Sequence, residues 1–239
     1  MMGFFEYYLR TIDVDGARAF YSAVLGDRKL EVFQLHEQAL ARGARPHWLG
    51  FIDVGDVDGA TSAFVARGAT SLGPKWVNPQ GLEASVVRDP GGAVVALAKP
   101  APKPASDASA GDSSLGVEWH LLNTRDVEGA KKNYSEVLGW EFKAPLDLGT
   151  YGVFHPFAWQ AGGAPVGSMS DIATRPGVHP HWLFHFRVGA LDPAVDAVRA
   201  RGGSVVESVV IPGGDRIAIC DDPQGAAFTL REDSAAAGR

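Results

Sequence analysis

The stretch Pro180-His181-Trp182-Leu183-Phe184-His185-Phe186-Arg187-Val188 decides how the rest of the chain is interpreted. It is rich in aromatic residues and has the character of an extended strand. Its opening occurs once before, as Pro46-His47-Trp48-Leu49, and both copies lead into a polar turn, an Ala-rich helical pattern and Arg-Gly. Residues 46–72 and 180–206 are identical at 12 of 27 positions without a gap. Self-similarity of this kind indicates an internal repeat.

A second block extends the repeat. Residues 4–26 and 117–139 are identical at 11 of 23 positions, and both contain an Asp-Val pair and end in Val-Leu-Gly. The turn at Asp89-Pro90-Gly91-Gly92 corresponds to Asp222-Pro223-Gln224-Gly225. The offset between the copies is 113 residues in the first block and 134 in the His-Trp block, a difference of 21 residues. We therefore predict a duplication in which the first copy is shortened. In the second copy, the additional residues supply extended stretches at 151–157 and 164–169, which predict a hairpin that the first copy lacks.

The repeat also predicts the domain organisation. We expect an N-terminal module at 1–98, a linker rich in Pro, Ala and Ser at 99–115, a C-terminal module at 116–232 and a tail at 233–239. Each module is predicted to contain two strand–helix–strands units in sequence. Short connections and mixed order favour an α+β fold over a parallel, doubly wound sheet. Two copies of one module predict pseudo-two-fold symmetry, with the helices on the outer face of each sheet.

Composition excludes several classes of partner. The net charge of the 239 residues is −6 and no Lys/Arg cluster is present, which argues against nucleic-acid binding. No apolar run approaches the roughly 18 residues of a membrane span, and residues 1–6 show no signal-peptide pattern. The single cysteine, Cys220, fits a reducing compartment. We expect a cytoplasmic protein without membrane contact, and a homodimer is left open.

The order of predicted elements resembles the vicinal oxygen chelate superfamily, which includes glyoxalase I, bleomycin-resistance proteins and extradiol dioxygenases. The likeness is carried by Asp13-Val14-Asp15-Gly16-Ala17, by Asp126-Val127-Glu128-Gly129-Ala130, by the Val-Leu-Gly helix ends and by the two Asp-Pro-x-Gly turns. It covers everything except the linker and the tail. The resemblance implies tandem βαβββ-type modules whose sheets curl around a cleft. In the family's metal enzymes, His and Glu side chains hold a divalent ion in that cleft.

The resemblance also implies that this metal site has been lost. The ligand positions on the first strand, the His-Trp strand and the last strand of the two modules are occupied by Glu6, Trp119, Leu49, Leu183, Ala96 and Thr229. Only Glu6 among them is a common metal ligand, and residues 164–169, where a further ligand would fall, contain no His, Asp or Glu. We therefore predict no metal and no other cofactor.

Histidine and aromatic residues are the remaining site candidates. His181 and His185 are four residues apart on one strand and so share a face, and His47 corresponds to His181 in the first module. Two interpretations stay open: the imidazoles line a ligand pocket, or the His-Trp pairs pack at the module interface with each imidazole bonded to a backbone carbonyl. His120 would face the other way. We interpret Cys220 as a buried small side chain, because no base lies near it in the sequence.

In the family, each cleft combines the first half of one module with the second half of the other. The predicted ligand-binding residues are therefore Glu6, Tyr8, His181, His185 and Thr229 in one cleft, and Trp119, Tyr151, His47 and Leu49 in the other, deeper cleft. The sequence favours a superfamily protein of unassigned activity that binds a small aromatic or hydrophobic molecule in an inter-module cleft without the usual metal. The alternative is a metal-dependent lyase, isomerase or dioxygenase acting on a small oxygenated substrate, so the question of catalysis stays open.

Overall fold

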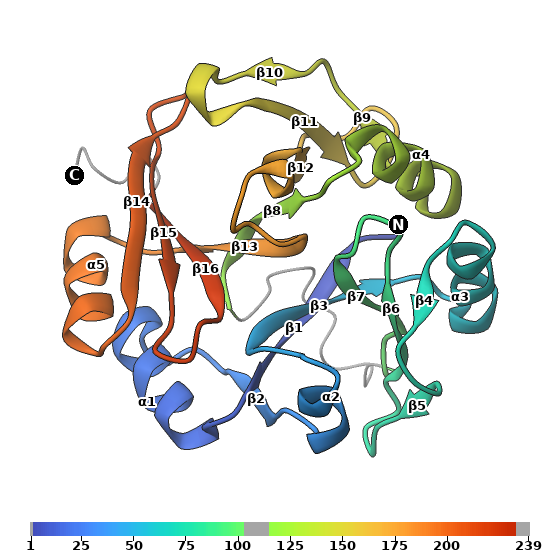
Figure 1. The fold of residues 1–239 in the computed structure, drawn as a ribbon, viewed down its shortest axis with the longest axis horizontal. Coiled ribbons are helices and arrows are strands. Elements are labelled where there is room, and N and C mark those ends of the chain that lie inside the picture. The colour runs from blue at the N-terminus through green and yellow to red at the C-terminus, as the bar shows by residue number, and fades with distance from the viewer. Residues whose placement is uncertain (1, 103–114, 233–239) are drawn as a thin grey trace. The chain divides into compact units, whose positions relative to one another are not determined.

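A computed structural model describes residues 2–102 and 115–232 (Figure 1). They form a mixed α+β fold with two sheets of mixed strands, so the predicted class with two tandem βαβββ-type modules is confirmed. Residues 103–114 of the predicted linker and the predicted tail at 233–239 lie outside the described residues. The module boundaries drawn from the repeat stay a prediction.

The first module supplies a seven-stranded sheet in the described part of the chain. Its elements are β1 (Phe4–Thr11), α1 (Val14–Leu25), β2 (Glu31–Gln34), α2 (Glu37–Ala41), β3 (His47–Asp53), α3 (Val57–Ala66), β4 (Thr70–Ser71), β5 (Trp76–Val77), β6 (Glu83–Arg88) and β7 (Val94–Lys99). The strand order is β2-β1-β3-β7-β6-β4, and β5 pairs with β6. The pairs β1–β2 and β3–β7 are parallel, whereas β6–β7 is antiparallel.

The second module supplies a nine-stranded sheet over the residues that are described. Its elements are β8 (Val117–Asn123), α4 (Val127–Leu138), β9 (Glu141–Phe142), β10 (Leu146–Asp147), η1 (Gly149–Tyr151), β11 (Val153–Ala158), β12 (Gly167–Ser170), η2 (Ile172–Thr174), β13 (His181–Arg187), α5 (Leu191–Ala200), β14 (Ser204–Val210), β15 (Arg216–Asp221) and β16 (Ala227–Glu232). The order is β10-β11-β12-β8-β13-β16-β15-β14, with β9 on β11. Strands β11 and β12 form the antiparallel pair that the longer copy was expected to add.

The repeated Asp-x-x-Gly motif forms a helix N-cap in both modules. The side chain of Asp13 accepts a hydrogen bond from the Gly16 amide at 2.9 Å, and Asp126 accepts one from Gly129 at the same distance. A Cβ atom at either glycine would lie 2.2 Å from Oδ2, the second oxygen of the capping carboxylate. Glycine is therefore required beside the cap, which satisfies an otherwise unpaired amide of the first turn.

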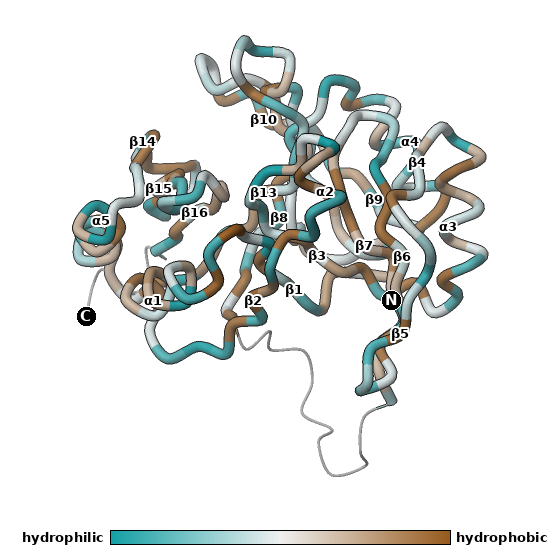
Figure 2. Tube along the Cα trace, turned by 60° about the horizontal axis from the view of Figure 1, so that its bottom comes forward, coloured by the Kyte–Doolittle hydropathy of each residue, from teal (hydrophilic) through white to brown (hydrophobic). Residues whose placement is uncertain are grey.

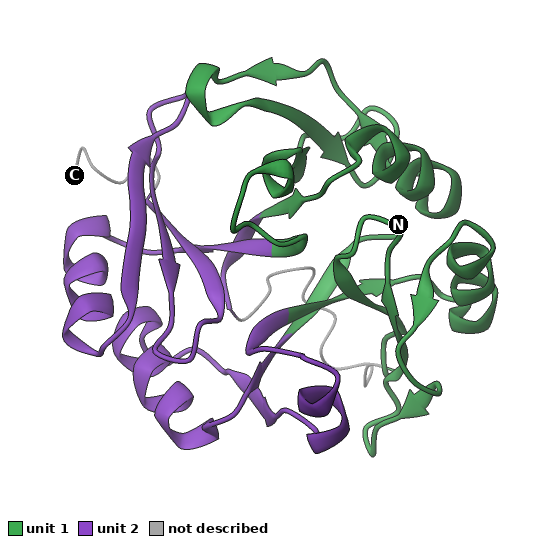
Figure 3. Cartoon of the chain, viewed as in Figure 1, with its two compact units in different colours: residues 1–7, 49–112, 120–182 green, residues 8–48, 113–119, 183–239 purple. Residues whose placement is uncertain are grey.

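The chain divides into two compact units that do not coincide with the two modules (Figure 3). Unit 1 comprises Met1–Tyr7, Leu49–Asp112 and His120–Trp182, and unit 2 comprises Tyr8–Trp48, Ser113–Trp119 and Leu183–Arg239. Each unit thus combines one half of each module. Helices α3 and α4 pack together in unit 1, and α1 and α5 pack together in unit 2.

Each unit contains the same buried group, made of the Asp of an Asp-Pro turn, a helix Tyr and the Trp of a His-Trp strand. The group is Asp89, Tyr134 and Trp182 in unit 1, and Asp222, Tyr21 and Trp48 in unit 2. The Tyr134 hydroxyl donates to Asp89 Oδ2 at 3.1 Å, and Trp48 Nε1 donates to the Tyr21 hydroxyl at 3.0 Å. Burial raises the pKa of both aspartates. These three residues, which occur in both copies of the repeat, therefore belong to the buried cores of the two units.

Hydropathy varies around the helices as packing against a sheet requires (Figure 2). Helix α5, for example, buries Leu191, Ala194, Val195 and Val198 and exposes residues between them. Over the described residues, no helix is long and apolar enough to cross a membrane.

Candidate functional site

Two predicted site residues lie side by side on neighbouring strands of unit 2. Strands β13 and β16 are parallel, and their register places His185 opposite Thr229. The residue before Thr229 on β16 is Phe228. It faces helix α1, where its ring centroid lies 5.3 Å from that of Tyr21. Because side chains alternate along a strand, His185 and Thr229 lie on the sheet face away from α1. Both are buried.

Arg231 extends this face by one further side chain. It lies two residues beyond Thr229 on β16, so its side chain points the same way. Its guanidinium carbon is 5.7 Å from the centroid of the Trp119 ring, within the range of a cation–π contact. Its Nε and Nη2 atoms donate to Asp215 Oδ2 at 3.1 and 2.5 Å. We call the surface formed by Trp119, His185, Thr229 and Arg231 the site face.

The site face brings together residues that sequence analysis treated separately. The sequence predicts Trp119 and Thr229 in different clefts, whereas in the structure both lie on one face together with Arg231. The strand alternation from Thr229 would have placed Arg231 on the same face. Strand alternation does not predict the contact between Arg231 and Trp119, because the two residues lie on different strands and far apart in the chain.

The donor atoms of the site face do not fit a divalent metal ion. They comprise the imidazole of His185 and the hydroxyl of Thr229, and the nearby carboxylate of Asp215 is bonded to Arg231. The guanidinium of Arg231, on the same sheet face, would repel a dication, and neutral donors alone hold a dication weakly. Within residues 2–102 and 115–232, no group of three or more His, Cys, Asp or Glu side chains is arranged to hold a metal ion.

Two predicted residues of unit 2 have other neighbours. Tyr8 is buried on β1, and its ring centroid lies 4.8 Å from that of Phe33. Arg10 lies over both rings, at 5.9 Å from the Tyr8 centroid and 5.1 Å from the Phe33 centroid. The Nδ1 atom of His47 lies 2.7 Å from the backbone oxygen of Arg45 and, because a carbonyl only accepts, donates to it.

His181 lies in unit 1 and is held in a similar way. Its Nδ1 donates to the backbone oxygen of His179 at 2.7 Å, and its Nε2 accepts from Asn123 Nδ2 at 3.3 Å. Asn123 in turn accepts from the Ser170 hydroxyl at 3.0 Å. Burial lowers the pKa of His181 to about 4, so the imidazole is neutral at neutral pH. His47 and His181 thus each donate to a backbone carbonyl. This is the bonding expected if the His-Trp pairs pack in the core instead of lining a ligand pocket.

The remaining predicted residues lie in unit 1 at different depths. Glu6 is half-buried on β1, and Leu49 is buried on β3. Tyr151 ends the short helix η1 instead of lying on β11, and 38% of its surface is exposed. The division into units runs through the strands that carry the predicted residues, so each predicted cleft draws residues from both units. The cleft assignments stay predictions.

A buried Tyr–His pair in unit 1 was not predicted. The Tyr7 hydroxyl lies 2.6 Å from Nε2 of His120, whose Nδ1 donates to the backbone oxygen of Val166 at 2.8 Å. With the proton on Nδ1, Nε2 accepts from Tyr7. The Phe4 ring stacks on the imidazole at 4.9 Å between centroids. Burial lowers the pKa of His120 to about 4 and raises that of Tyr7, so both groups are neutral at neutral pH.

Cys220 has the environment of a core side chain. It lies on β15 opposite Phe228 and is buried. Burial raises the pKa of its thiol to about 12. A thiolate is the reactive form of cysteine, so this residue is poorly suited to act as a nucleophile.

The sequence of the second module is similar to a known family. Residues 116–230 match the family described as Glyoxalase/Bleomycin resistance protein/Dioxygenase superfamily. The anthracycline biosynthesis protein DauV of Streptomyces sp. (strain C5) is 32% identical over 187 residues, which are 77% of this chain. The match spans 65% of DauV, just under two thirds of its length. The putative glyoxylase CFP32 of Mycobacterium bovis is 27% identical over 244 residues, with 93% of this chain and 91% of CFP32 covered.

Solved structures of the same fold cover nearly the whole chain. The Mn(II)-bound glyoxalase from Novosphingobium aromaticivorans has a TM-score of 0.63 at 14% identity and covers 96% of this chain and 81% of its own. The 2,3-dioxygenase LapB from Pseudomonas sp. KL28 has a TM-score of 0.60 at 12% identity and covers 96% of this chain and 91% of its own. At such identities, the likeness shows the fold alone.

Proposed function

We propose that the chain, whose residues 116–230 match the glyoxalase/bleomycin resistance protein/dioxygenase superfamily, is a member of this superfamily that binds a small aromatic or hydrophobic molecule without the metal ion of the family's enzymes. The observation that carries the proposal is the contact between Trp119 and Arg231 on a face whose donors do not fit a metal. The relative DauV is named an anthracycline biosynthesis protein. A cytoplasmic location and a homodimer belong to the same proposal.

The chemistry of the site face supports a flat ligand with oxygen substituents. An indole ring offers a surface on which an aromatic ring stacks. The hydroxyl of Thr229 and the imidazole of His185 supply hydrogen bonds at the buried end of the face. Arg231 adds a positive charge fixed by Asp215, which favours carbonyl, phenolate or carboxylate oxygens. Apolar stacking with a few placed polar groups is the usual character of a small-molecule site.

Metal analysis separates this proposal from the enzyme alternative. We expect protein purified without chelator to contain far less than one equivalent of Ni, Zn, Fe or Mn by plasma mass spectrometry. The reason is that the site face has a threonine, Thr229, at the position where the family's enzymes need a carboxylate, and a cation, Arg231, two residues further along the strand. A stoichiometric metal that is lost together with an activity in His181→Ala or His185→Ala would instead support a metal-dependent lyase, isomerase or dioxygenase.

Substitution of Trp119 tests the location of the ligand. We expect Trp119→Ala to weaken the binding of an aromatic compound found by thermal-shift screening at least about fivefold, because an aromatic pair is worth about 1 kcal/mol beyond the area it buries. Glu6→Gln serves as the control, because it changes a half-buried side chain of unit 1 and should leave the dissociation constant unchanged. Titration calorimetry measures both. If Glu6→Gln abolishes binding and Trp119→Ala does not, the ligand lies elsewhere.

A further inference from the structure

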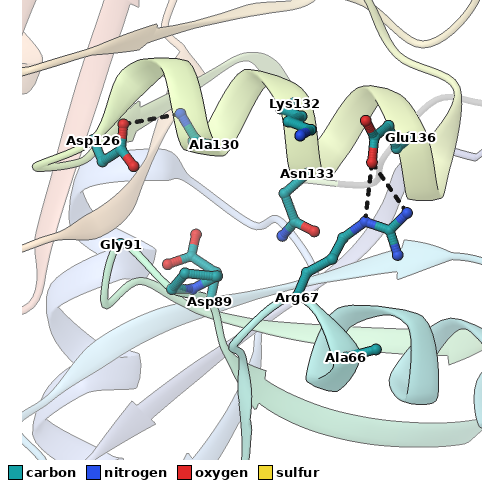
Figure 4. A pocket seen from close by; sticks show the side chains of 11 residues that line it. Ala66, Arg67, Asp89, Gly91, Asp126, Ala130, Lys132, Asn133 and Glu136 are labelled. Atoms are coloured by element: carbon teal, nitrogen blue, oxygen red, sulfur yellow. Dashed lines mark hydrogen bonds and ion pairs between the residues drawn. The ribbon is translucent and has the colours of Figure 1, made fainter.

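Unit 1 contains a pocket on its helical side, separate from the site face. It has a volume of about 500 Å³ and lies between α3, α4 and the Asp89 turn (Figure 4). Its polar lining includes Arg67, Asp89, Lys132, Asn133 and Glu136. A pocket of this size is in the range that holds small molecules.

Asn133 is the feature of this pocket that needs an explanation. Only 4% of its surface is exposed, yet neither its Oδ1 nor its Nδ2 has a hydrogen-bond partner among the described residues. Figure 4 shows its amide directed from α4 into the space above the Asp89 turn. Leaving a buried polar group unpaired costs about 1–3 kcal/mol, so nearly all such groups in proteins have a partner.

The internal repeat shows that the fold does not require a polar residue here. With the offset of 113, Asn133 corresponds to Phe20, which is buried in unit 2 with its ring centroid 5.9 Å from that of Phe228. Lys132 and Glu136 likewise correspond to alanines of the first module. Apolar packing therefore serves this helix position in one copy, whereas the other copy has a polar amide.

The Asp89 turn beside α4 also has a smaller residue than the corresponding turn of unit 2. Gly91 lines the pocket of unit 1, and the corresponding residue of unit 2 is Gln224. The side chain of Gln224 occupies that place and accepts from the backbone amides of Ile12 and Asp13 at 3.1 and 2.8 Å. Two positions that carry large side chains in unit 2 thus carry small ones in unit 1. Both positions line the pocket of unit 1.

The charges around the pocket limit what it accepts. Arg67 is bonded to Glu136 at 3.1 Å, and Asp89 accepts from Tyr134 at 3.1 Å. The lining side chains include three carboxylates and two cations, which disfavours an anionic ligand. The amide of Asn133 presents one acceptor and one donor side by side, so its complement is a group with a donor next to an acceptor. We propose that this pocket binds a small neutral molecule that carries a carboxamide, lactam or urea edge.

The test uses nicotinamide as the probe and the full chain labelled with ¹⁵N. We expect saturable shifts of the Asn133 side-chain NH₂ and the Gly91 amide in NMR titrations. Nicotinate, in which a second acceptor replaces the donor, should bind at least about tenfold more weakly, since one hydrogen bond is lost and a charge is added. This inference does not depend on the ligand of the site face, because Trp119→Ala should leave the nicotinamide shifts unchanged.

Asn133→Phe gives the matched variant, because it restores the residue found at the same position in unit 2. We expect it to remove nicotinamide binding while the protein still melts cooperatively, and Asn133→Leu serves the same purpose if the phenylalanine prevents folding. The proposal is overturned if nicotinamide produces no saturable shift in the pocket, which would mean that only water pairs with Asn133. It is equally overturned if the variant binds nicotinamide as well as the parent.

Discussion

Replacing Trp140 with alanine is expected to lower the free energy of unfolding by about 3–5 kcal/mol, the usual cost of truncating a buried aromatic residue to alanine. The indole is 2% exposed and lies parallel to the Phe157 ring, with 4.6 Å between centroids and 7° between planes. It also stacks on Tyr134 at 5.0 Å. Its Nε1 donates to the backbone oxygen of Met2 at 2.7 Å, so the substitution removes a hydrogen bond as well as the packing.

Urea unfolding at pH 7 measures this effect, with Trp76→Ala as the control. Trp76 is half-buried on β5, and its ring centroid lies 6.3 Å from that of Phe51. Its loss should therefore cost clearly less than the loss of Trp140. Equal destabilisation by the two substitutions would show that the ring contacts and the hydrogen bond of Trp140 do not make the larger contribution to stability.

Acid is expected to destabilise the protein between pH 6.5 and 4 through His120. The pKa of this imidazole is lowered by burial from its ordinary value of 6.5 to about 4. Between these values the unfolded chain binds a proton that the folded chain does not. The contribution of the neutral imidazole to the free energy of unfolding is therefore fully present above pH 6.5 and is lost as the pH falls toward 4. A difference of this size corresponds to about 3 kcal/mol. His181, whose pKa is also lowered to about 4, adds in the same direction.

The measurement is the free energy of unfolding in urea at pH 7 and at pH 4.5, for the parent and for His120→Gln. The variant should be less stable at pH 7, because the Tyr7 hydroxyl and the Val166 carbonyl lose their partner. Its loss of stability between the two pH values should nevertheless be smaller, since glutamine does not titrate. A loss as large as that of the parent would assign the acid sensitivity to other groups.

The secondary structure could largely be predicted because its signals are local. The Asp13 and Asp126 caps act within one turn of helix, and the Asp89 and Asp222 turns close over four residues. Strand β11 is an instructive exception. It begins at Val153 because the glycines at 149 and 152 adopt positive φ and enclose the short helix η1, so Tyr151 lies before the strand.

The candidate sites could be predicted only in part. The absence of the family's carboxylate at Thr229 is visible in the sequence, because the repeat fixes where the last strand begins. The contact of Trp119 with Arg231 is not visible, since it depends on how strands β8 and β16 are placed in one sheet. The pocket around Asn133 was overlooked because the periodicity of α4 marks that position as buried and says nothing about what fills the space beside it.

The sequence by itself therefore determined the internal repeat, the resemblance to the superfamily and the order of elements, because each follows from residues close together in the chain or from the likeness of two segments. Only the tertiary structure decided how the halves associate. It joins the second half of each module with the first half of the other into a compact unit, and so brings Asp89 to Tyr134 and Asp222 to Tyr21. Such contacts depend on strand order and register, which are set by the combined packing of many side chains and leave no local signal in the sequence.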